Sequence, residues 1–276
     1  MLLIQNILYG IISGITEFLP VSSRAHQFLL RYLFGAQTRD PLQDLLVHIG
    51  VFFAIIFACR ENLAHLRREQ KSLSASRRKR IRPADVRTLY DLRLLKTAAF
   101  PLIIGLFLSF YTKKMENSLL AIMGFLVLNS FVLLLADHVS HGNRDSRTMT
   151  GLDGIIMGLI GALSAFPGIS RTGMISAYTT MRGADGQNTA NWSILLGLPA
   201  MIFAIIYDIV GLAAGGIVVS GFAAFFGCLL SGIAAFGSGY FGISLLRIVM
   251  NNSGFSKFAY YSLGAALFSF ILYLIT

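Results

Sequence analysis

Charge is the scarcest component of this sequence. Only 13% of its 276 residues are Asp, Glu, Lys or Arg, whereas 55% are hydrophobic. A soluble domain carries about 25% charged residues, so this chain has roughly half the charge that a water-facing surface needs. The shortage excludes a soluble globular enzyme and a disordered chain. It indicates a protein that crosses a membrane several times.

Cysteine is scarce as well, and basic residues are absent from the start of the chain. The two cysteines, Cys59 and Cys228, lie in or beside apolar segments, without histidines at zinc-ligand spacing. This excludes a disulfide scaffold and gives no indication of a zinc site. The first 23 residues contain no Lys or Arg, so the basic region of a cleavable signal is missing. We expect residue 1 onward to belong to the mature protein.

The charges that are present gather in one stretch. Residues 60–96 hold 12 Lys or Arg and 4 Asp or Glu, which is 16 of the 36 charges in the chain. In a soluble protein the net charge of +10 would suggest nucleic acid. Here the basic excess lies between apolar segments, and positive residues collect in cytoplasmic loops. We therefore expect 60–96 to be a cytoplasmic basic loop and expect no nucleic-acid partner.

Apolar segments of nearly membrane-spanning length recur along the chain. A span needs about 20 apolar residues, or fewer where a helix is broken. The segments that fit are 2–19, 45–59, 97–112, 118–136, 154–169, 192–208, 209–228, 230–250 and 258–275. The pattern predicts an all-α polytopic membrane protein that forms a single membrane domain over 1–276.

Two further apolar stretches, 25–34 and 172–181, are too short to cross a bilayer. Each follows a Pro- and Ser-containing break, FLPVSSRAH in the first case and AFPGISRTG in the second. Irregular backbone at membrane depth survives only inside protein or beside a wet cavity, so each run predicts a re-entrant helical hairpin. A shift of 147 residues superimposes the P-x-x-S-R pattern of one break on that of the other. We infer an internal duplication, with a first repeat over 1–140 and a second over 148–276.

Ionisable side chains inside apolar segments are costly and usually face a cavity or a partner. Most of those in this chain cluster at the two breaks, where hydroxyl side chains accompany them. The set consists of Glu17, Ser22, Ser23, Arg24 and His26 in the first break, Ser170, Arg171 and Thr172 in the second, and Asp44, His48, Arg182 and Asp208 elsewhere.

These residue types suit a phosphate ester or anhydride at the end of a lipid. Arg171 offers a planar fork of donors that matches phosphate, and the helix start after each break presents free N–H groups to an anion. Ser22 and Ser23 supply hydroxyl nucleophiles or donors. His26 lies three residues after Ser23, on the same helix face, where a base can activate a hydroxyl. Glu17 can hold a divalent cation, orient His26 or act as an acid or base.

Some of these residues also have simpler explanations. Arg24 can extend to the lipid headgroups or pair with Glu17. His48, alone in an apolar helix, is more typical of a hydrogen-bonded structural residue than of a ligand. Asp208 is expected to be a charge at a helix end. For Glu17 and Arg171 we favour function, because an unpaired charge at a helix break is costly.

TEFLPVSSRAH at 16–26 and FPGISRTG at 166–173 resemble the two signature motifs of the bacterial undecaprenyl-diphosphate phosphatase family. DLLVHIG at 44–50 follows the first motif at the family's spacing, and the resemblance covers nearly the whole chain. These are integral enzymes of the bacterial cytoplasmic membrane, linked to bacitracin resistance. The resemblance implies an inverted repeat whose two re-entrant hairpins meet in a pocket open to the outer face. It also implies hydrolysis of undecaprenyl diphosphate to the monophosphate and inorganic phosphate, which recycles the carrier lipid of cell-wall synthesis.

The resemblance also implies roles for particular residues. Ser23 would be the nucleophile, His26 would assist proton transfer, and Glu17 would be the acidic motif residue that holds a divalent cation, Mg or Ca. The substrate-binding residues would be Ser22, Arg24, Ser170, Arg171 and Thr172. The partners are then a polyprenyl diphosphate lipid and the membrane, with a homodimer as one possible assembly.

Two positions depart from the family pattern. Ser13 stands where the first motif normally has another acidic or amide residue, so the cation is expected to bind more weakly. Ile175 stands where a Thr usually follows the second motif. Two alternatives to the phosphatase therefore stay open: a polyprenyl-phosphate transporter or flippase without enzymatic activity on the same fold, and a hydrolase acting on another lipid phosphate.

Overall fold

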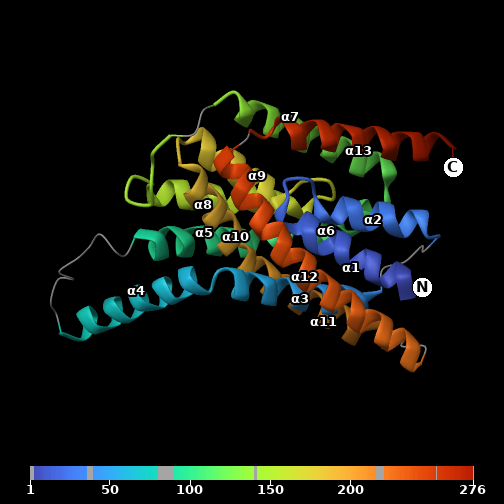
Figure 1. The fold of residues 1–276 in the computed structure, drawn as a ribbon, viewed down its shortest axis with the longest axis horizontal. Coiled ribbons are helices and arrows are strands. Elements are labelled where there is room, and N and C mark those ends of the chain that lie inside the picture. The colour runs from blue at the N-terminus through green and yellow to red at the C-terminus, as the bar shows by residue number, and fades with distance from the viewer. Residues whose placement is uncertain are drawn as a thin grey trace.

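Helices account for all regular structure in the parts that the computed structural model describes, which are residues 3–35, 40–79, 90–139, 142–215, 221–252 and 254–275. Figure 1 shows their arrangement. The helices are α1 (Leu3–Phe18), α2 (Ser23–Leu33), α3 (Pro41–Ala58), α4 (Arg60–Lys79), α5 (Tyr90–Leu106), α6 (Ser109–Thr112), η2 (Lys113–Asn117), α7 (Leu119–Asp137), α8 (Gly151–Ala162), η3 (Leu163–Ala165), α9 (Arg171–Met181), α10 (Gly186–Leu195), α11 (Gly197–Gly215), α12 (Phe222–Asn252) and α13 (Ser256–Ile275).

Six stretches of the described chain are long and apolar enough to cross a bilayer. They are Pro41–Ala58, Asp91–Asn117, Leu119–Asp137, Gly186–Gly215, Phe222–Asn251 and Ser256–Ile275. Large apolar side chains cover their outer surfaces, among them Phe100 on α5 and Leu267 on α13, which are 70% and 59% exposed. Such an apolar surface is unusual in a soluble monomer but matches the hydrocarbon of a bilayer. The predicted all-α polytopic membrane protein is confirmed.

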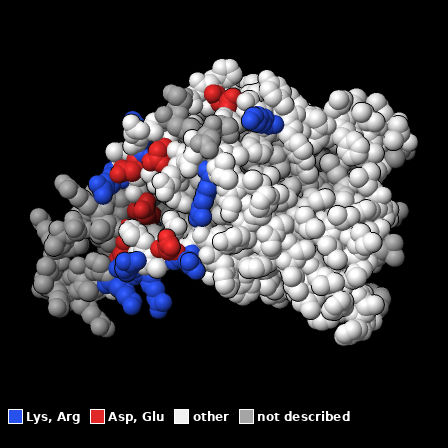
Figure 2. All heavy atoms as spheres, in the orientation of Figure 1, with Lys and Arg blue, Asp and Glu red and all other residues white. Residues whose placement is uncertain are grey.

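Charged residues gather at one end of the molecule. Figure 2 shows most of the Lys, Arg, Asp and Glu of this face at the end that holds α4 and a few near the middle of its upper edge, while the end at the chain termini carries none. The predicted basic loop over 60–96 is helical at both ends, because α4 follows α3 almost directly and α5 begins at Tyr90. Residues 80–89 of that loop lie outside the described residues. The positive-inside rule predicts that the end with α4 faces the cytoplasm, and this orientation stays a prediction.

Two pairs of short helices form hairpins that enter from opposite ends. α1 and α2 start and finish at the end away from α4, whereas α8 and α9 start and finish at the α4 end (Figure 1). The α1–α2 chain turns at 19–22, and the α8–α9 chain turns at 166–170. Both turns are the Pro- and Ser-containing breaks of the sequence. Two helical hairpins are therefore present in the structure, while their re-entry into the membrane and the internal duplication stay predictions.

Two boundaries predicted from the sequence were wrong, one after Asp208 and one between 228 and 230, where α12 continues without a break. We expected two apolar segments to meet between Asp208 and residue 209, but α11 runs through this point and ends at Gly215. The preceding helix, α10, joins α11 at Leu196, and residues 222–228 belong to α12. Asp208 is therefore an interior residue of α11 and not a charge at its end. A partner on α3 makes this position tolerable, as described below.

Small residues let α1 pack closely on α12. A Cβ atom built at Gly14 would overlap the carbonyl oxygen of Ala235 and the hydroxyl of Ser238. Close backbone approach through small residues is a common way for helices to associate inside a membrane, where burial of apolar surface gives little driving force. The contact fixes α1, and with it the first break, against the longest helix of the protein.

Gly168 in the second break is held in a conformation that excludes other residues. Its φ is +115°, and a Cβ there would lie 2.7 Å from Cβ of Phe125 and 2.8 Å from the carbonyl oxygen of Ile122. A side chain at this position would meet both backbone strain and a steric clash with α7. Backbone conformation and packing therefore explain why the PGISR motif has glycine at this position, whatever the chemistry of the site.

We expect Gly168→Ala to lower the free energy of unfolding by about 2–4 kcal/mol, since strain and overlap combine. Thermal unfolding of the detergent-solubilised protein measures the change. Gly124→Ala on α7 is the control, because a Cβ at Gly124 meets nothing within 4 Å. Alanine there removes a flexible residue from a helix interior and should leave the melting temperature equal or higher. Equal melting temperatures for the Gly168 and Gly124 variants would contradict this explanation.

Candidate functional site

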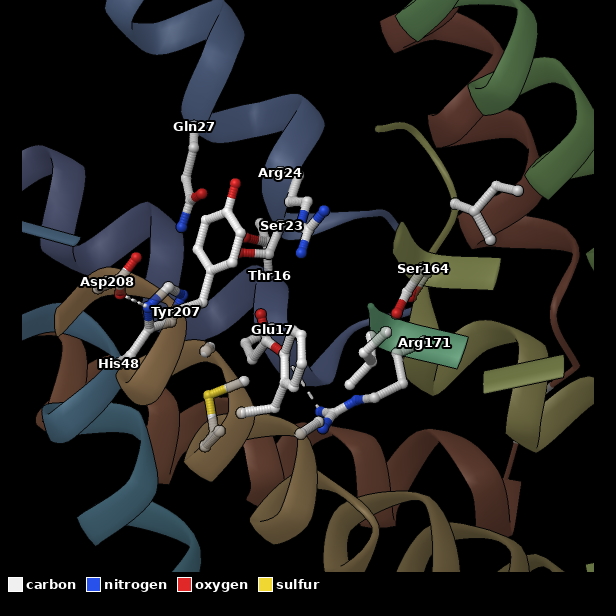
Figure 3. A pocket seen from close by; sticks show the side chains of 17 residues that line it. Thr16, Glu17, Ser23, Arg24, Gln27, His48, Ser164, Arg171, Tyr207 and Asp208 are labelled. Atoms are coloured by element: carbon white, nitrogen blue, oxygen red, sulfur yellow. Dashed lines mark hydrogen bonds and ion pairs between the residues drawn. The ribbon is translucent and has the colours of Figure 1, made fainter. Parts of the chain in front are cut away.

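A cavity of about 70 Å³ lies where the two breaks approach each other. This is room for several water molecules or a phosphate group. Polar and charged side chains from both hairpins and from α3 and α11 line it (Figure 3). These are Thr16, Glu17, Ser23, Arg24, Gln27, His48, Ser164, Ser170, Arg171, Tyr207 and Asp208, with an apolar wall of Leu106, Ile169, Ala200, Met201, Phe203 and Ala204.

The two breaks are joined by hydrogen bonds between their serines and backbone. Ser22 caps α2, and its hydroxyl oxygen also accepts from the backbone N–H of Gly168 at 3.2 Å. Ser170 caps α9 by accepting from Gly173 N–H at 3.1 Å, and its hydroxyl donates to the carbonyl of Leu19 at 3.2 Å. Each serine therefore starts its own helix and holds the opposite break. The N-termini of α2 and α9 are placed together by this exchange.

Asn129 on α7 completes the junction, and sequence reasoning missed it. Its amide nitrogen donates to the carbonyl of Pro20 at 3.1 Å, and its amide oxygen accepts from the backbone N–H of Ser170 at 2.9 Å. The residue is fully buried. One side chain thus satisfies a carbonyl of the first break and an N–H of the second. An asparagine inside an apolar helix was the available signal, since a buried amide needs partners.

Arg171 presents unused donors to the cavity. Its Nη1 donates to the carbonyl of Leu196 at 3.5 Å, and its Nη2 lies 3.2 Å from Oε1 of Glu17 as an ion pair. The approach to Glu17 lacks hydrogen-bond alignment, so the buried Nε and Nη2 atoms have no hydrogen-bond partner among the described residues. A buried guanidinium with unsatisfied donors is costly unless an anion completes it. The arrangement favours a phosphate in this cavity.

Arg24 lies on the opposite wall and is already bonded to protein. Nη1 donates to the carbonyl of Ala165 at 3.0 Å and lies 3.4 Å from Oε1 of Glu116, while Nη2 donates to the hydroxyl of Ser109 at 3.1 Å. These contacts tie α2 to the chain around α6 and η3. The guanidinium pairs with Glu116 and not with Glu17, which was one of the simpler explanations from the sequence.

The structure does not bring His26 to the cavity. Its Nδ1 lies 2.8 Å from the carbonyl oxygen of Ser22, its Nε2 lies 2.8 Å from the hydroxyl of Tyr261, and its ring stacks on the Tyr261 ring. Both ring nitrogens are thus engaged on the side that faces α13. On α2, the cavity face is taken by Ser23, Arg24 and Gln27. The sequence argument placed His26 beside Ser23 from helical spacing, which did not reveal which side faces the cavity.

Two further expected members, Ser22 and Thr172, also lie off the cavity lining. Ser22 is a buried cap, and the Thr172 hydroxyl donates to the backbone carbonyl of Glu17 at 3.0 Å. Ser13 is buried one turn before Glu17, and its hydroxyl has no hydrogen-bond partner among the described residues. Its carbonyl accepts weakly from the Ser23 hydroxyl at 3.5 Å. The Thr172 hydroxyl thus holds the backbone of Glu17 in place, and its role in substrate binding stays a prediction.

His48 and Asp208 are cavity residues that the sequence argument set aside. Nδ1 of His48 donates to Oδ2 of Asp208 at 2.5 Å, joining α3 to α11 (Figure 3). The Asp208 side chain is 4% exposed and that of His48 is 14% exposed. We expected the histidine to be structural and the aspartate to be a helix-end charge. Both were charged or titratable groups in apolar segments, which was the signal, but their separation of 160 residues hid the pairing.

A divalent cation finds one suitable ligand from the protein here. Glu17 contributes a carboxylate to the cavity, while the carboxylate of Asp208 is taken by His48. Among the described residues, the group of three metal-ligating side chains that could hold an ion, His65, Glu69 and Asp91, lies elsewhere, where α4 meets α5. Mg²⁺ is usually bound by one or two carboxylates together with substrate phosphates and water. Glu17 fits that mode and does not form a cage without the phosphate.

A family profile described as "Bacitracin resistance protein BacA" matches residues 6–268. The chain belongs to this family. Curated relatives agree: an "Undecaprenyl-diphosphatase" of Treponema denticola is 29% identical over 269 residues, covering 95% of this chain and 94% of the relative. An "Undecaprenyl-diphosphatase 2" of Stutzerimonas stutzeri is 31% identical over 253 residues, covering 90% of this chain and 91% of the relative. The resemblance drawn from the motifs is confirmed.

We expect Asn129→Leu to lower the free energy of unfolding by about 2–5 kcal/mol, because it leaves the Pro20 carbonyl and the Ser170 N–H buried without partners. Thermal unfolding in detergent provides the measurement. Ser130→Ala is the matched control on the same helix, since Ser130 donates a single bond to the Ala259 carbonyl at 2.8 Å. That variant should lose about 1 kcal/mol. If both variants lost the same amount, Asn129 would not be the joint between the two breaks.

Proposed function

We propose that this protein hydrolyses undecaprenyl diphosphate to undecaprenyl phosphate and inorganic phosphate in the bacterial cytoplasmic membrane. The names of its curated relatives and the family match support the activity. The reaction would return the carrier lipid to cell-wall synthesis and confer bacitracin resistance. The homodimer stays a prediction.

The observation that carries the proposal is Arg171. Its buried Nε and Nη2 atoms have no aligned hydrogen-bond partner among the described residues, although Nη2 forms an ion pair with Glu17. Arg171 lines a cavity that also holds a serine hydroxyl, and two helix N-termini meet beside it. Helix N-termini and guanidinium groups both favour phosphate. A serine hydroxyl beside the same anion has the composition needed for phosphoryl transfer. Few other ligands would bond to the planar guanidinium of Arg171 and also present a reacting atom to the serine hydroxyl.

Five residues of the cavity then have a role. Ser23 provides the attacking oxygen, and Arg171 holds the terminal phosphate and the charge that develops on it. The first amides of α9, which the Ser170 cap orients, hold the neighbouring phosphate, with Arg24 on the facing wall. Glu17 keeps Arg171 oriented and would hold a Mg or Ca ion. A bound divalent cation would neutralise phosphate charge and align the diphosphate.

The position of the cavity suits a lipid substrate. His48 and Asp208, which line it, lie near the middle of two apolar helices, α3 and α11. Midplane sites between paired broken helices are also found in transporters. The names of the relatives favour hydrolysis over transport without chemistry, and release of phosphate distinguishes the two.

Purified protein in detergent should release inorganic phosphate from undecaprenyl diphosphate, faster with Mg²⁺ than in excess chelator. Ser23→Ala should lower the rate by at least ~10³-fold, since it removes the nucleophile. Ser244→Ala, on α12 outside the cavity, is the control and should be as active as the wild type. Folded wild-type protein that releases no phosphate would overturn the proposed hydrolysis and favour transport.

Replacing the fork of Arg171 with a point charge should also slow the reaction. Arg171→Lys keeps the positive charge but loses paired donation to phosphate, so kcat/KM should fall at least ~10-fold. Arg182→Lys is the control, because Arg182 bonds to Asp153 outside the cavity. Phosphate release at several substrate concentrations gives the comparison. Unchanged kcat/KM in Arg171→Lys would remove the fork from the mechanism.

A further inference from the structure

The cavity holds a histidine whose orientation is fixed by a carboxylate. His48 uses Nδ1 to donate to Asp208, which leaves Nε2 on the far side of the ring. No hydrogen-bond partner among the described residues reaches Nε2, and His48 lies on the cavity lining. Figure 3 shows this pair on one side of the cavity and the Glu17–Arg171 pair on the other. A carboxylate that fixes one nitrogen of a histidine so that the other can move a proton is a recurring catalytic arrangement.

His48 has this arrangement and His26 lacks it. Both nitrogens of His26 are engaged, by the Ser22 carbonyl and the Tyr261 hydroxyl, on the side away from the cavity. The other titratable side chains of the cavity already have bonding partners as well. Glu17 pairs with Arg171, and Arg24 is bonded to protein on its own wall. Nε2 of His48 is therefore the nitrogen base available to a proton leaving the reaction.

We propose that His48 is the general base and acid of this phosphatase and that Asp208 is its positioning residue. The inference rests on the proposed hydrolysis and adds to it the group that carries the proton. It also explains why a carboxylate is kept inside the apolar helix α11, where it is 4% exposed. Asp208 stabilises the imidazolium that forms when Nε2 takes a proton, and it fixes the tautomer beforehand.

The proton balance runs through two steps. As Ser23 Oγ bonds to the terminal phosphorus, its proton passes to Nε2 of His48. The bond from phosphorus to the bridging oxygen breaks, its electron pair stays on the lipid phosphate, and His48 returns the proton to that phosphate. Water then attacks the phosphoserine, giving its proton to Nε2 as its oxygen bonds to phosphorus. The Ser23–phosphorus bond breaks, and His48 passes this proton to Ser23 Oγ, which regenerates the hydroxyl.

A purely structural role for the pair makes a different prediction. The ion pair joins α3 to α11, so its loss could only loosen the packing of two helices. A general base, in contrast, must be neutral to start the reaction, so kcat/KM rises with pH through its titration. Three carboxylates act electrostatically on His48: Asp208 on α11, Asp44 on α3 and Glu17 on α1. Variants of His48 must therefore be judged by the pH profile and by rescue, not by rate alone.

The test is phosphate release from undecaprenyl diphosphate between pH 5 and 9, with melting temperatures for every variant. His48→Gln should lower kcat about 10²-fold or more with little change in KM, and should lose the rising limb of the profile. Asp208→Asn should lower kcat about 10-fold. His48→Ala should regain activity when imidazole is added, which a structural variant would not do. His138→Gln, on the exposed end of α7, is the control and should match the wild type.

His26→Gln separates the two histidines. Whatever the rate of His26→Gln, this variant should keep the rising limb of the pH profile, because His26 does not take the proton. A wild-type kcat and an intact rising limb of the pH profile in His48→Gln would overturn the inference. Loss of that limb in His26→Gln alone would overturn it as well. Neither result would contradict the proposed phosphatase activity. If His48→Gln does not fold, Asp208→Asn, which has nearly the same shape as the wild type, takes its place. A lowered kcat together with a displaced rising limb supports the inference, and a wild-type kcat with an unchanged limb overturns it. Folded wild type without phosphate release overturns the proposed function itself.

Discussion

The junction between the two breaks is the constraint on which the rest of the site depends. Five hydrogen bonds cross it or bridge it. They run from Gly168 N–H to Ser22, from Ser170 to the Leu19 carbonyl, from Thr172 to the Glu17 carbonyl, and two through Asn129. Broken helices expose backbone groups that have no water to bond inside a bilayer, so each break must satisfy the other. The same exchange sets the N-termini of α2 and α9 side by side. The anion site is thus a direct result of how the backbone is satisfied.

Charge inside the membrane is handled by pairs that are distant in sequence. Arg171 meets Glu17, His48 meets Asp208 and Arg24 meets Glu116, in each case across different helices. An isolated charge at this depth would cost several kcal/mol, and a partner together with further hydrogen bonds offsets that cost. Each pair also fixes the relative position of two elements around the cavity. The polar groups that serve chemistry therefore also define the geometry of the apolar bundle.

The sequence predicted the spans and hairpins because their signals are local. A run of apolar residues, a proline and a serine within a few positions are enough to place α1, α2, α8 and α9. Glu17 and Arg171 were found for the same reason, since a charge beside a break is conspicuous. The partners of Asp208 and Asn129 could not be found this way, because they lie more than 40 residues away. His26 lies off the cavity lining, and its role in proton transfer stays a prediction, whereas the boundary drawn at Asp208 was wrong. A local pattern cannot show which way a helix faces or what neutralises its charge.

The mutual support of the hairpins has a consequence for how the protein is made. Ser22 is bonded to a residue 146 positions later, so the first hairpin is synthesised long before its counterpart exists. At about 5–20 residues per second, the interval is on the order of ten seconds. During that time the carbonyls and N–H groups of residues 19–22 depend on the insertion machinery or on water. The first hairpin can settle at its final depth only after the second has emerged, which makes its insertion a late event although it comes first in the chain.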